Sequence, residues 1–282
     1  MSKLTCFILA ATFMLSTATS CRKAFDFIRD HPDAHASFCR VDTIRIKFDN
    51  PSDDVLTVTY NKKGDPVTVL SHSKFSVGGQ YFRYDLLNRL TDYIQTDIWD
   101  TGQAPFAVNW HKYGYPRPGF VTDTTFSDFG DASKPAPNAA DDPIGYFIVG
   151  YTFDAQGRID RYWSVSKDPH QPPQPGAKVI YDANGNQPLT NAERYYDNKV
   201  NAYRTNKVWQ FVYHNYSRNN ELPLSPDPGV IILPSPVYND LGLPLLLPNS
   251  FERNMTFFGL TSTGPTFNIT YACSMPKGPI DY

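Results

Sequence analysis

A short turn pattern recurs along the chain and constrains its fold more than any other feature. An aromatic residue is followed by Asp or Asn, by two further residues, and then by Gly or Asn. The pattern occurs at 60–65, 84–89, 153–158 and 181–186, and as a variant at 196–201. We expect the aromatic residue to end a strand, the Asp or Asn to cap the turn, and the Gly or Asn to adopt a positive φ. The repeated pattern predicts a series of β-hairpins.

The segments beside these turns support the same fold. Residues 55–60 and 158–163 alternate between apolar and polar side chains, as half-buried strands do. Aromatic residues make up 15% of the chain and suit a pleated surface, whereas its 24 prolines disfavour long helices. The sequence therefore predicts a mainly β protein, an antiparallel β-meander of repeated hairpins that forms a twisted open sheet with few short helices.

Long proline-rich segments connect the predicted hairpins. Residues 131–143 and 168–176 have the composition of surface loops. Residues 223–248 combine prolines with apolar runs, and we expect an extended strap whose Leu and Ile side chains pack on the sheet, because an exposed run of that kind would aggregate. Residues 254–273 again have the pattern of strands around a Gly-Pro turn.

The N-terminus has the features of a secretory signal peptide. Lys3 supplies a positive charge, residues 4–15 are apolar, and the small residues 18–20 lead directly to Cys21. A cysteine at that position is typical of a bacterial lipoprotein signal, after which the mature chain begins with a lipidated Cys21. We predict a signal peptide at 1–20, a lipid-anchored segment at 21–38 and a single β-meander domain at 39–282.

Two other interpretations of this terminus remain open. Ala18-Thr19-Ser20 also fits an ordinary signal peptidase, which would release a soluble chain with a free Cys21. Asn215, Asn254 and Asn268 each begin a glycosylation triplet, as in a eukaryotic secreted protein, although such triplets arise often by chance in a chain rich in Asn and Thr.

Two cysteines remain for the mature domain. Cys6 leaves with the signal peptide and Cys21 is the predicted lipid attachment residue, so Cys39 and Cys273 stand near the two ends of the domain. An oxidising compartment permits these two to form a disulfide, and two separate buried thiols are the alternative.

The turn segments also resemble a known group of sequences. Residues 181–188, 196–201 and 217–220 resemble tyrosine-aspartate (YD, Rhs-type) repeats, and their order is similar to that in an uncharacterised family of lipid-anchored β proteins of Bacteroidetes-type bacteria. Ala202 stands where that family usually has proline, and Glu221 follows the Asn pair. The resemblance implies a fold and a compartment, and it carries no catalytic residues.

Few residue patterns indicate a chemistry. The sequence has no G-x-S-x-G, H-E-x-x-H, P-loop or G-x-G-x-x-G motif, and its six histidines are scattered. Asp182, Asn184, Asn186 and Glu193 match positions of a calcium loop, but Gln187 stands where that loop needs glycine. We predict no metal and no cofactor, and an enzyme is the less favoured class.

The most suggestive surface pattern is aromatic. Trp99 and the group Trp110, Tyr113 and Tyr115 are interleaved with polar residues. If exposed, these rings could stack on sugars and bind a glycan. The alternative is that they pack across neighbouring strands, since Trp and Tyr are commonly buried with their polar tips hydrogen-bonded.

The sequence thus favours a non-enzymatic interaction or scaffold module, with a glycan-binding protein as the first alternative and a hydrolase as the second. Its expected partners are a membrane, through the lipid anchor, and an unidentified protein or glycan. A net charge of −2 and no basic stripe argue against nucleic acid. Arg22 and Lys23 follow Cys21 without an acidic cluster, so we predict an outer-membrane lipoprotein that faces the periplasm more readily than the cell surface.

Overall fold

The computed structural model describes a large part of the chain in detail. The predicted signal peptide, Cys21 and Trp99 lie outside the described residues, as does most of the proline-rich connection at 131–143, so the predictions made for them stay predictions. The described residues are 38–47, 54–71, 79–97, 106–131, 146–168, 170–189, 194–223, 234–248, 256–257, 260–261 and 266–274.

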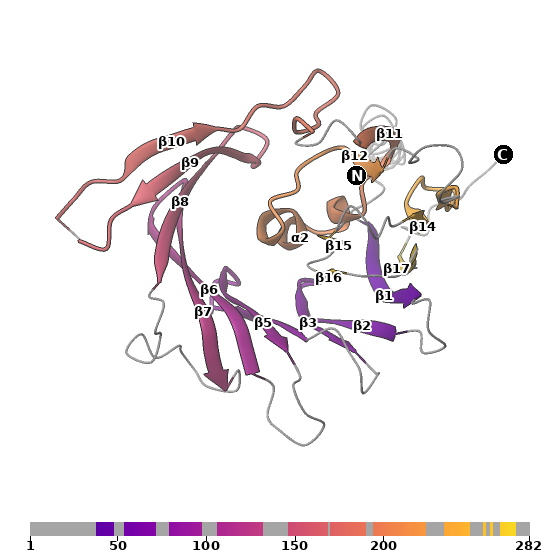
Figure 1. Ribbon diagram of the computed structural model, residues 1–282, viewed down its shortest axis with the longest axis horizontal. Coiled ribbons are helices and arrows are strands. Elements are labelled where there is room, and N and C mark those ends of the chain that lie inside the picture. Colours follow the sequence, from indigo (N-terminus) through magenta and orange to yellow (C-terminus); the bar gives the residue numbers. More distant parts are fainter. Residues whose placement is uncertain are drawn as a thin grey trace, which may run out of the picture.

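Thirteen described strands form one antiparallel sheet (Figure 1). From edge to edge their order is β10-β9-β8-β7-β6-β5-β4-β3-β2-β1-β17-β14-β13, so the run from β1 to β10 is a meander. The sheet is open and the protein is mainly β, which confirms the predicted fold class. The strands are β1 (Cys39–Lys47), β2 (Asp54–Tyr60), β3 (Pro66–Ser71), β4 (Gln80–Tyr84), β5 (Leu90–Asp97), β6 (Phe106–Arg117), β7 (Phe120–Asp131), β8 (Phe147–Phe153), β9 (Ile159–Val165), β10 (Gln174–Lys178), β13 (Val237–Tyr238), β14 (Pro244–Pro248) and β17 (Thr266–Cys273).

Small elements accompany the sheet. Figure 1 shows the sheet curving around a short helical segment, which lies on its concave side. Among the described residues, no helix has the length and the apolar composition that a membrane span requires. These elements are the two-stranded sheet of β11 (Arg194–Val200) and β12 (Asn219–Pro223), the two-stranded sheet of β15 (Thr256–Phe257) and β16 (Leu260–Thr261), and, between β11 and β12 in the chain, the 3-10 helix η2 (Ala202–Thr205) and the helix α2 (Lys207–Val212).

The main hydrophobic core lies between the concave face of the sheet and the segment formed by η2 and α2. Trp209 of α2 is fully buried, and its ring meets the ring of Phe82 edge-on at 5.3 Å between centroids. Strand residues alternate between this core and the other face of the sheet, as the period of a strand requires. Other core members include Val41, Ile44, Ile46, Leu56, Val69, Tyr93, Tyr113, Tyr151, Tyr203, Tyr216, Leu222, Phe267 and Ile269.

Asn206 holds the helical segment in place. Its side-chain oxygen accepts a hydrogen bond from the backbone N–H of Val208 at 2.8 Å and so caps α2. Its side-chain amide donates to the carbonyl oxygen of Gly64 at 2.9 Å, in the turn between β2 and β3. The start of α2 therefore lies beside that turn.

The predicted turn chemistry is confirmed at 61–65, 85–89, 154–158 and 182–186. In each turn the first N–H donates to the carbonyl oxygen four positions later, and Oδ1 of the leading Asp or Asn accepts two further backbone N–H groups. The left-handed region accommodates Gly and Asn more readily than other residues. The φ angles of the fourth residues are 88° at Gly64, 62° at Asn88, 78° at Gly157 and 83° at Gly185.

The variant pattern at 196–201 does not form a turn, so that prediction was wrong. These residues belong largely to β11, which bulges between Tyr196 and Val200 as it pairs with β12. Oδ1 of Asp197 accepts the N–H of Lys199 at 2.9 Å, as in the other turns, but its second backbone N–H comes from Asn220, whose side-chain amide donates to Oδ2.

Two predicted connections also contain regular structure. The same turn as above forms at 239–243, inside the segment predicted to be an extended strap, and it joins β13 to β14. The loop predicted at 168–176 runs into β10, whose residues are all exposed at the sheet edge. Proline can occur in such a strand, because an edge strand leaves half of its N–H groups without a ladder partner.

Tyrosines that precede the turns connect neighbouring hairpins. The hydroxyl of Tyr60 donates to the carbonyl oxygen of Val41 at 2.7 Å, and the hydroxyl of Tyr181 donates to that of Ile159 at 3.0 Å. The guanidinium of Arg158 lies 3.8 Å from the centroid of the Tyr181 ring, which it covers. These tyrosines thus connect successive turn segments through a side chain. The turn at 182–186 closes no hairpin, because β10 and β11 belong to different sheets, so the hairpin predicted at 181–186 was wrong.

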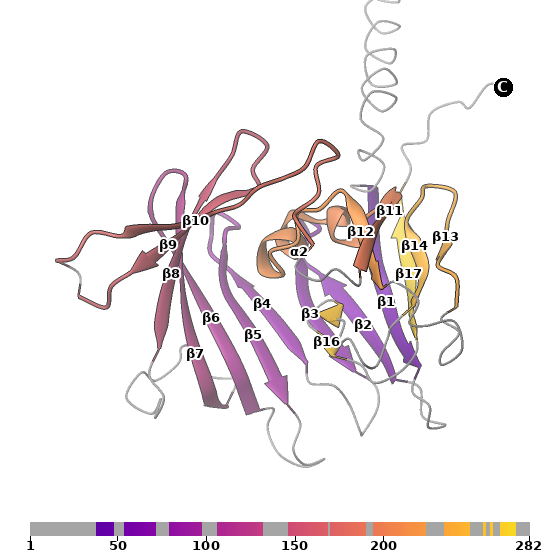
Figure 2. The same ribbon diagram turned by 45° about the horizontal axis from the view of Figure 1, so that its top comes forward.

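The turns gather at one rim of the sheet. In an antiparallel meander alternate connections lie at the same end, so the turns at 61–65, 85–89 and 154–158 share a rim. Cys39, the first residue of β1, lies at this rim too, because β1 begins beside the end of β2 at Tyr60. We call this end of the strands the turn rim. Figure 2 shows the strands running from the turn rim to the opposite rim.

A disulfide closes the described domain. Cys39 and Cys273 form the bond, with their Cα atoms 4.0 Å apart and 234 positions between them in sequence. They are direct partners in the ladder between β1 and β17. The sequence left open a disulfide or two separate thiols for this pair, and the structure has the disulfide.

Candidate functional site

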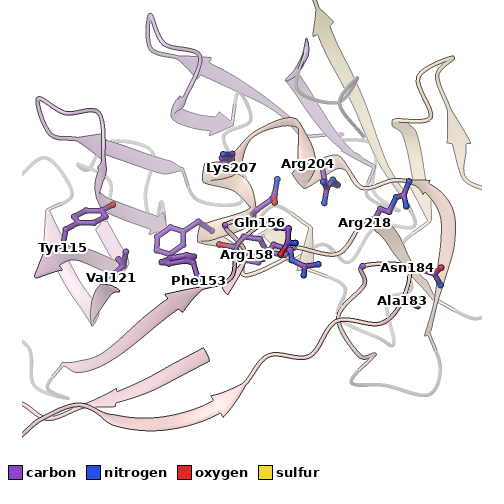
Figure 3. Close-up of a pocket in the computed structure, with 15 residues that line it drawn as sticks. Tyr115, Val121, Phe153, Gln156, Arg158, Ala183, Asn184, Arg204, Lys207 and Arg218 are labelled. Atoms are coloured by element: carbon purple, nitrogen blue, oxygen red, sulfur yellow. The ribbon is translucent and has the colours of Figure 1, made fainter. Parts of the chain in front are cut away.

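A cavity of about 550 Å³ lies beside the turn rim. It opens between the turns at 154–158 and 182–186 and the segment of η2 and α2, and its volume is in the range of small-molecule sites. Figure 3 shows side chains from these separate segments converging on it. The described residues that line it are Tyr115, Val121, Phe153, Gln156, Gly157, Arg158, Ala183, Asn184, Gly185, Arg204, Lys207, Gln210, Phe211, Tyr216 and Arg218.

Four of these lining residues are basic and, among the described ones, none is Asp or Glu. The basic residues are Arg158, Arg204, Lys207 and Arg218. This balance differs from that of the whole chain, which has a net charge of −2. The cavity therefore concentrates positive charge that the average composition does not predict.

Arg158 is held by its own turn. Its Nε donates to Oδ2 of Asp154 at 2.8 Å, and the face of its guanidinium covers Tyr181. A guanidinium carries four further N–H donors on its two Nη atoms, in a fork that matches phosphate and carboxylate oxygens. Asp154 offsets part of the positive charge of Arg158 while it orients the group.

The other cations are positioned by backbone contacts. The N–H of Arg218 donates to the carbonyl oxygen of Gly185 at 3.3 Å, and its carbonyl oxygen accepts from the N–H of Asn201 at 2.9 Å. Asn201 also caps η2, which carries Arg204 in its last turn. Lys207 is the exposed first residue of α2.

One wall of the cavity is apolar. It includes Val121, Phe153 and Phe211, and the last two rings lie 6.1 Å apart. Tyr115 presents its ring here, while its hydroxyl donates to the carbonyl oxygen of Leu90 at 2.7 Å. Burial raises the pKa of Tyr115 to about 12 although the nearby Arg89 lowers it, so the phenol stays neutral at pH 7.

A second cavity of about 420 Å³ adjoins the first and shares Asn184 and Arg218 with it. It is rich in amides, but its central groups bond one another. The amide of Asn186 donates to the side-chain oxygen of Asn219 at 3.1 Å, and Asn219 in turn donates to the carbonyl oxygen of Lys199. We interpret these contacts as the means by which the turn at 182–186 is fixed to the two-stranded sheet of β11 and β12.

The aromatic residues predicted to bind a glycan are mostly buried, so that interpretation is corrected. Trp110 is 1% exposed and packs with Ile94 and Phe126, and Tyr113 is 6% exposed within the main core. A ring can stack on a sugar only if its face is accessible. Tyr115 is half-buried and contributes to the basic cavity instead. The alternative interpretation, packing across neighbouring strands, is the one observed.

A polar cluster is enclosed between the sheet and α2. Nδ1 of His111 lies 3.0 Å from Oδ2 of Asp123, and the hydroxyl of Tyr151 donates to the same carboxylate oxygen at 3.2 Å. His214 packs against the ring of Tyr151 at 5.0 Å between centroids. Burial lowers the pKa of His214 to about 4, so its imidazole is neutral at pH 7. His111 and Tyr151 thus both contact the carboxylate of Asp123, and His214 packs beside them.

The turn that resembles a calcium loop has its leading carboxylate engaged by the backbone. Oδ1 of Asp182 accepts the N–H groups of Asn184 and Asn186, each at 2.8 Å. In the described part of the chain, no three or more His, Cys, Asp or Glu side chains are grouped as a metal site requires. Glu193 lies outside the described residues.

No protein-family model matches this chain, and a search of curated protein sequences gives no match. The resemblance to lipid-anchored YD-type proteins therefore stays a prediction.

The basic cavity was not predicted from the sequence. Arg158, Arg204 and Arg218 come from three segments that no local motif connects. The available signals were indirect: the arginine that ends the turn at 154–158, and the Asn-rich stretch at 215–220, through which β12 contacts the turn at 182–186.

Proposed function

We propose that this protein is a lipid-anchored, non-enzymatic binding module of the bacterial cell envelope, and that its ligand is an anion bound in the basic cavity. The observation that carries this proposal is the set of four basic side chains beside an apolar wall, with no carboxylate among the described lining residues. Complementary charge attracts such a ligand, and the guanidinium groups can bind its oxygens bidentately.

The shape of the cavity narrows the class of ligand. The rings of Tyr115, Phe153 and Phe211 offer apolar contact next to the cations, so the ligand that fits carries an anionic group on a hydrocarbon or ring skeleton. Phosphate esters and carboxylates of that kind satisfy both parts of the cavity. A fully polar anion would leave the apolar wall without a partner.

A hydrolase is less well supported. Hydrolysis of a glycoside requires two carboxyl groups about 5 to 10 Å apart across the scissile bond, and the described lining offers none. The tyrosines present are poor acids and bases at pH 7, because burial raises the pKa of Tyr115 and that of Tyr216. The lining residues are therefore suited to binding.

Titration with small anions tests the cavity. Phenyl phosphate, inorganic phosphate and uncharged phenol are titrated into the mature chain at low salt, and binding is followed by calorimetry. We expect phenyl phosphate to bind most tightly, since it alone contacts both the cations and the apolar wall, and we expect its affinity to fall as salt screens the charges.

Matched variants locate the binding. Lys207→Gln removes one exposed cation at the cavity, and we expect it to weaken phenyl phosphate binding about twofold to fivefold, in line with the loss of one exposed ion pair. Lys178→Gln removes an exposed cation on β10 that does not line the cavity, and should leave binding unchanged. Equal affinities in the two variants would contradict the proposed site.

The lipid anchor has a separate test. Intact mass is measured for the mature chain after expression in a Gram-negative host, with Cys21→Ser as the control. A diacyl or triacyl addition on a chain that begins at Cys21 supports the anchor. An unmodified chain in both cases would make the protein soluble and would contradict this part of the proposal, while leaving the cavity experiment unaffected.

A further inference from the structure

The turn rim carries exposed apolar and basic side chains next to each other. Leu86 and Leu87, at the tip of the turn between β4 and β5, are 103% and 72% exposed. Lys62 and Lys63, at the tip of the turn between β2 and β3, are exposed as well. Large apolar side chains at the tip of a surface turn are not needed for the fold, and because the two leucines are adjacent they form a small contiguous apolar patch, a feature of interaction sites.

The two turn tips are fixed side by side. The side-chain amide of Asn61 donates to Oδ1 of Asn88 at 3.2 Å, and the amide of Asn88 donates to Oδ2 of Asp65. These contacts engage Asp65, and Asp85 of the second turn forms an ion pair with Arg89 at 2.7 Å. The two acidic groups of the turns are thus paired within the rim.

The basic cavity belongs to the same rim. Asn206, which precedes Lys207, donates to Gly64 in the turn between β2 and β3. The positive charge of the rim therefore continues from the two lysines to Lys207 and into the cavity. A surface that combines apolar tips with neighbouring cations is complementary to the interface of an anionic bilayer.

The N-terminal connection also leads to this rim. The first described residues, Phe38 and Cys39, lie at the turn rim, and Cys21 stands 17 positions before Phe38. If Cys21 carries a lipid, the chain leaves the membrane and enters the domain at the rim that carries Leu86 and Leu87. A tether of that length raises the effective concentration of the rim at the bilayer, so a weak contact becomes populated.

We infer that the turn rim is a membrane-docking surface, in which Leu86 and Leu87 enter the bilayer interface while Lys62 and Lys63 contact anionic lipid headgroups. This inference rests on the proposed lipid anchor. The inferred docking also sets the orientation of the domain: the turn rim faces the membrane, the strands run away from it, and the opposite rim is the most distant part of the sheet.

An environment-sensitive fluorophore tests the orientation. The lipidated mature chain is reconstituted into vesicles of phosphatidylethanolamine and phosphatidylglycerol, with an NBD label on Leu86→Cys. Phe147→Cys is the matched control, because Phe147 is a 55% exposed apolar residue that begins β8 at the opposite rim. We expect emission at position 86 to shift to shorter wavelength and to be quenched by nitroxide lipids, while position 147 keeps its aqueous emission.

Flotation of the same samples separates the two proposals. A chain that does not float with the vesicles lacks the anchor. A chain that floats but shows aqueous emission at position 86 is anchored without docking, and that result would overturn the inference. A blue shift that appears without vesicles and grows with protein concentration would assign the surface to a second copy of the chain and would overturn it too.

A second pair of variants tests the lysines. Both positions are exposed, so Lys62→Gln with Lys63→Gln should leave the fold intact. We expect this double variant to reduce the blue shift at position 86 on phosphatidylglycerol vesicles and to abolish its dependence on salt. Lys167→Gln, at an exposed position just past the end of β9 at the opposite rim, is the control with unchanged emission. A shift that is equal on neutral and anionic vesicles would remove the role assigned to Lys62 and Lys63.

Discussion

The hydroxyl of Tyr84, the last residue of β4, donates a hydrogen bond of 2.6 Å to the carbonyl oxygen of Pro66, the first residue of β3. Tyr84 precedes the turn at 85–89, and Pro66 follows the turn of the same type at 61–65, so the bond connects one hairpin to the next. Equivalent bonds join Tyr181 to Ile159 and, at the C-terminal end, Tyr271 to Pro244. Burial raises the pKa of Tyr84, so its hydroxyl stays a donor over the whole range in which the protein is handled.

Tyr84→Phe should therefore destabilise the fold although it leaves the ring in place. The variant leaves the carbonyl oxygen of the buried Pro66 without this donor, and such a loss costs about 1 to 2 kcal/mol. Urea denaturation measures the difference in unfolding free energy. Tyr195→Phe is the control, since Tyr195 is 41% exposed. Equal losses in both variants would show that the bond to Pro66 contributes nothing specific.

The sequence predicts the turns well because their chemistry is local. Asp154 and Gly157 suffice to specify a turn, since the carboxylate bonds N–H groups two and four residues later and glycine supplies the positive φ. The variant at Asp197 differs at one decisive position: Val200 stands where the other turns have Gly or Asn, and a β-branched residue disfavours the positive φ that the turn requires. Asn220, from another strand, then donates to the carboxylate of Asp197. A pattern of neighbours in sequence contains no information about such a partner.

The cavity and the buried tryptophan were beyond prediction for the same reason. Arg158 and Arg218 are 60 positions apart, and they line one cavity because the turn at 182–186 lies between them. Trp110 and Tyr113 alternate with polar residues, which is compatible with an exposed platform and equally with a sheet that is covered on both faces. The second case holds: Tyr113 packs in the concave core, and Trp110 packs in a separate cluster.

Trp110→Ala should consequently act on stability. The indole N–H donates to Oδ1 of Asp92 at 2.9 Å, and the ring packs with Ile94 and Phe126 under the guanidinium of Arg83. Removal of a fully buried tryptophan side chain costs about 3 to 5 kcal/mol. Chemical denaturation of Trp110→Ala and Trp110→Phe, the latter keeping part of the packing, measures the loss. A stable Trp110→Ala variant with altered ligand binding would restore the glycan interpretation.

The disulfide should contribute strongly to stability. Because Cys39 and Cys273 are separated by 234 positions, the bond restricts the unfolded chain over most of the mature sequence. The chain-entropy model gives about 5 kcal/mol for a loop of that length, and this value is an upper bound where the reduced chain keeps residual structure. Denaturation with and without a reductant, together with the double variant Cys39→Ser, Cys273→Ser, measures it. An unchanged midpoint after thiol titration has shown full reduction would contradict the expectation.

His214 should make stability depend on pH between about 4 and 6.5. Burial lowers its pKa to about 4, while the neighbouring Asp123 raises the value and His111 lowers it further. An unfolded histidine has a pKa of about 6.5, so below that pH the unfolded state binds a proton that the folded state does not. The unfolding free energy therefore falls as the pH decreases from 6.5, by up to about 3 kcal/mol at pH 4.

The variant His214→Asn isolates this contribution. Residue 214 has φ of 50°, in the left-handed region that asparagine tolerates, so the backbone can keep its conformation. We expect urea denaturation at a series of pH values to show a shallower decline for His214→Asn than for the parent chain between pH 6.5 and 4. The difference between the two curves removes the contributions of the carboxylates, which both proteins share. Parallel curves would mean that His214 takes up its proton equally readily in the folded protein, and that its enclosure against Tyr151 and Tyr162 does not exclude water.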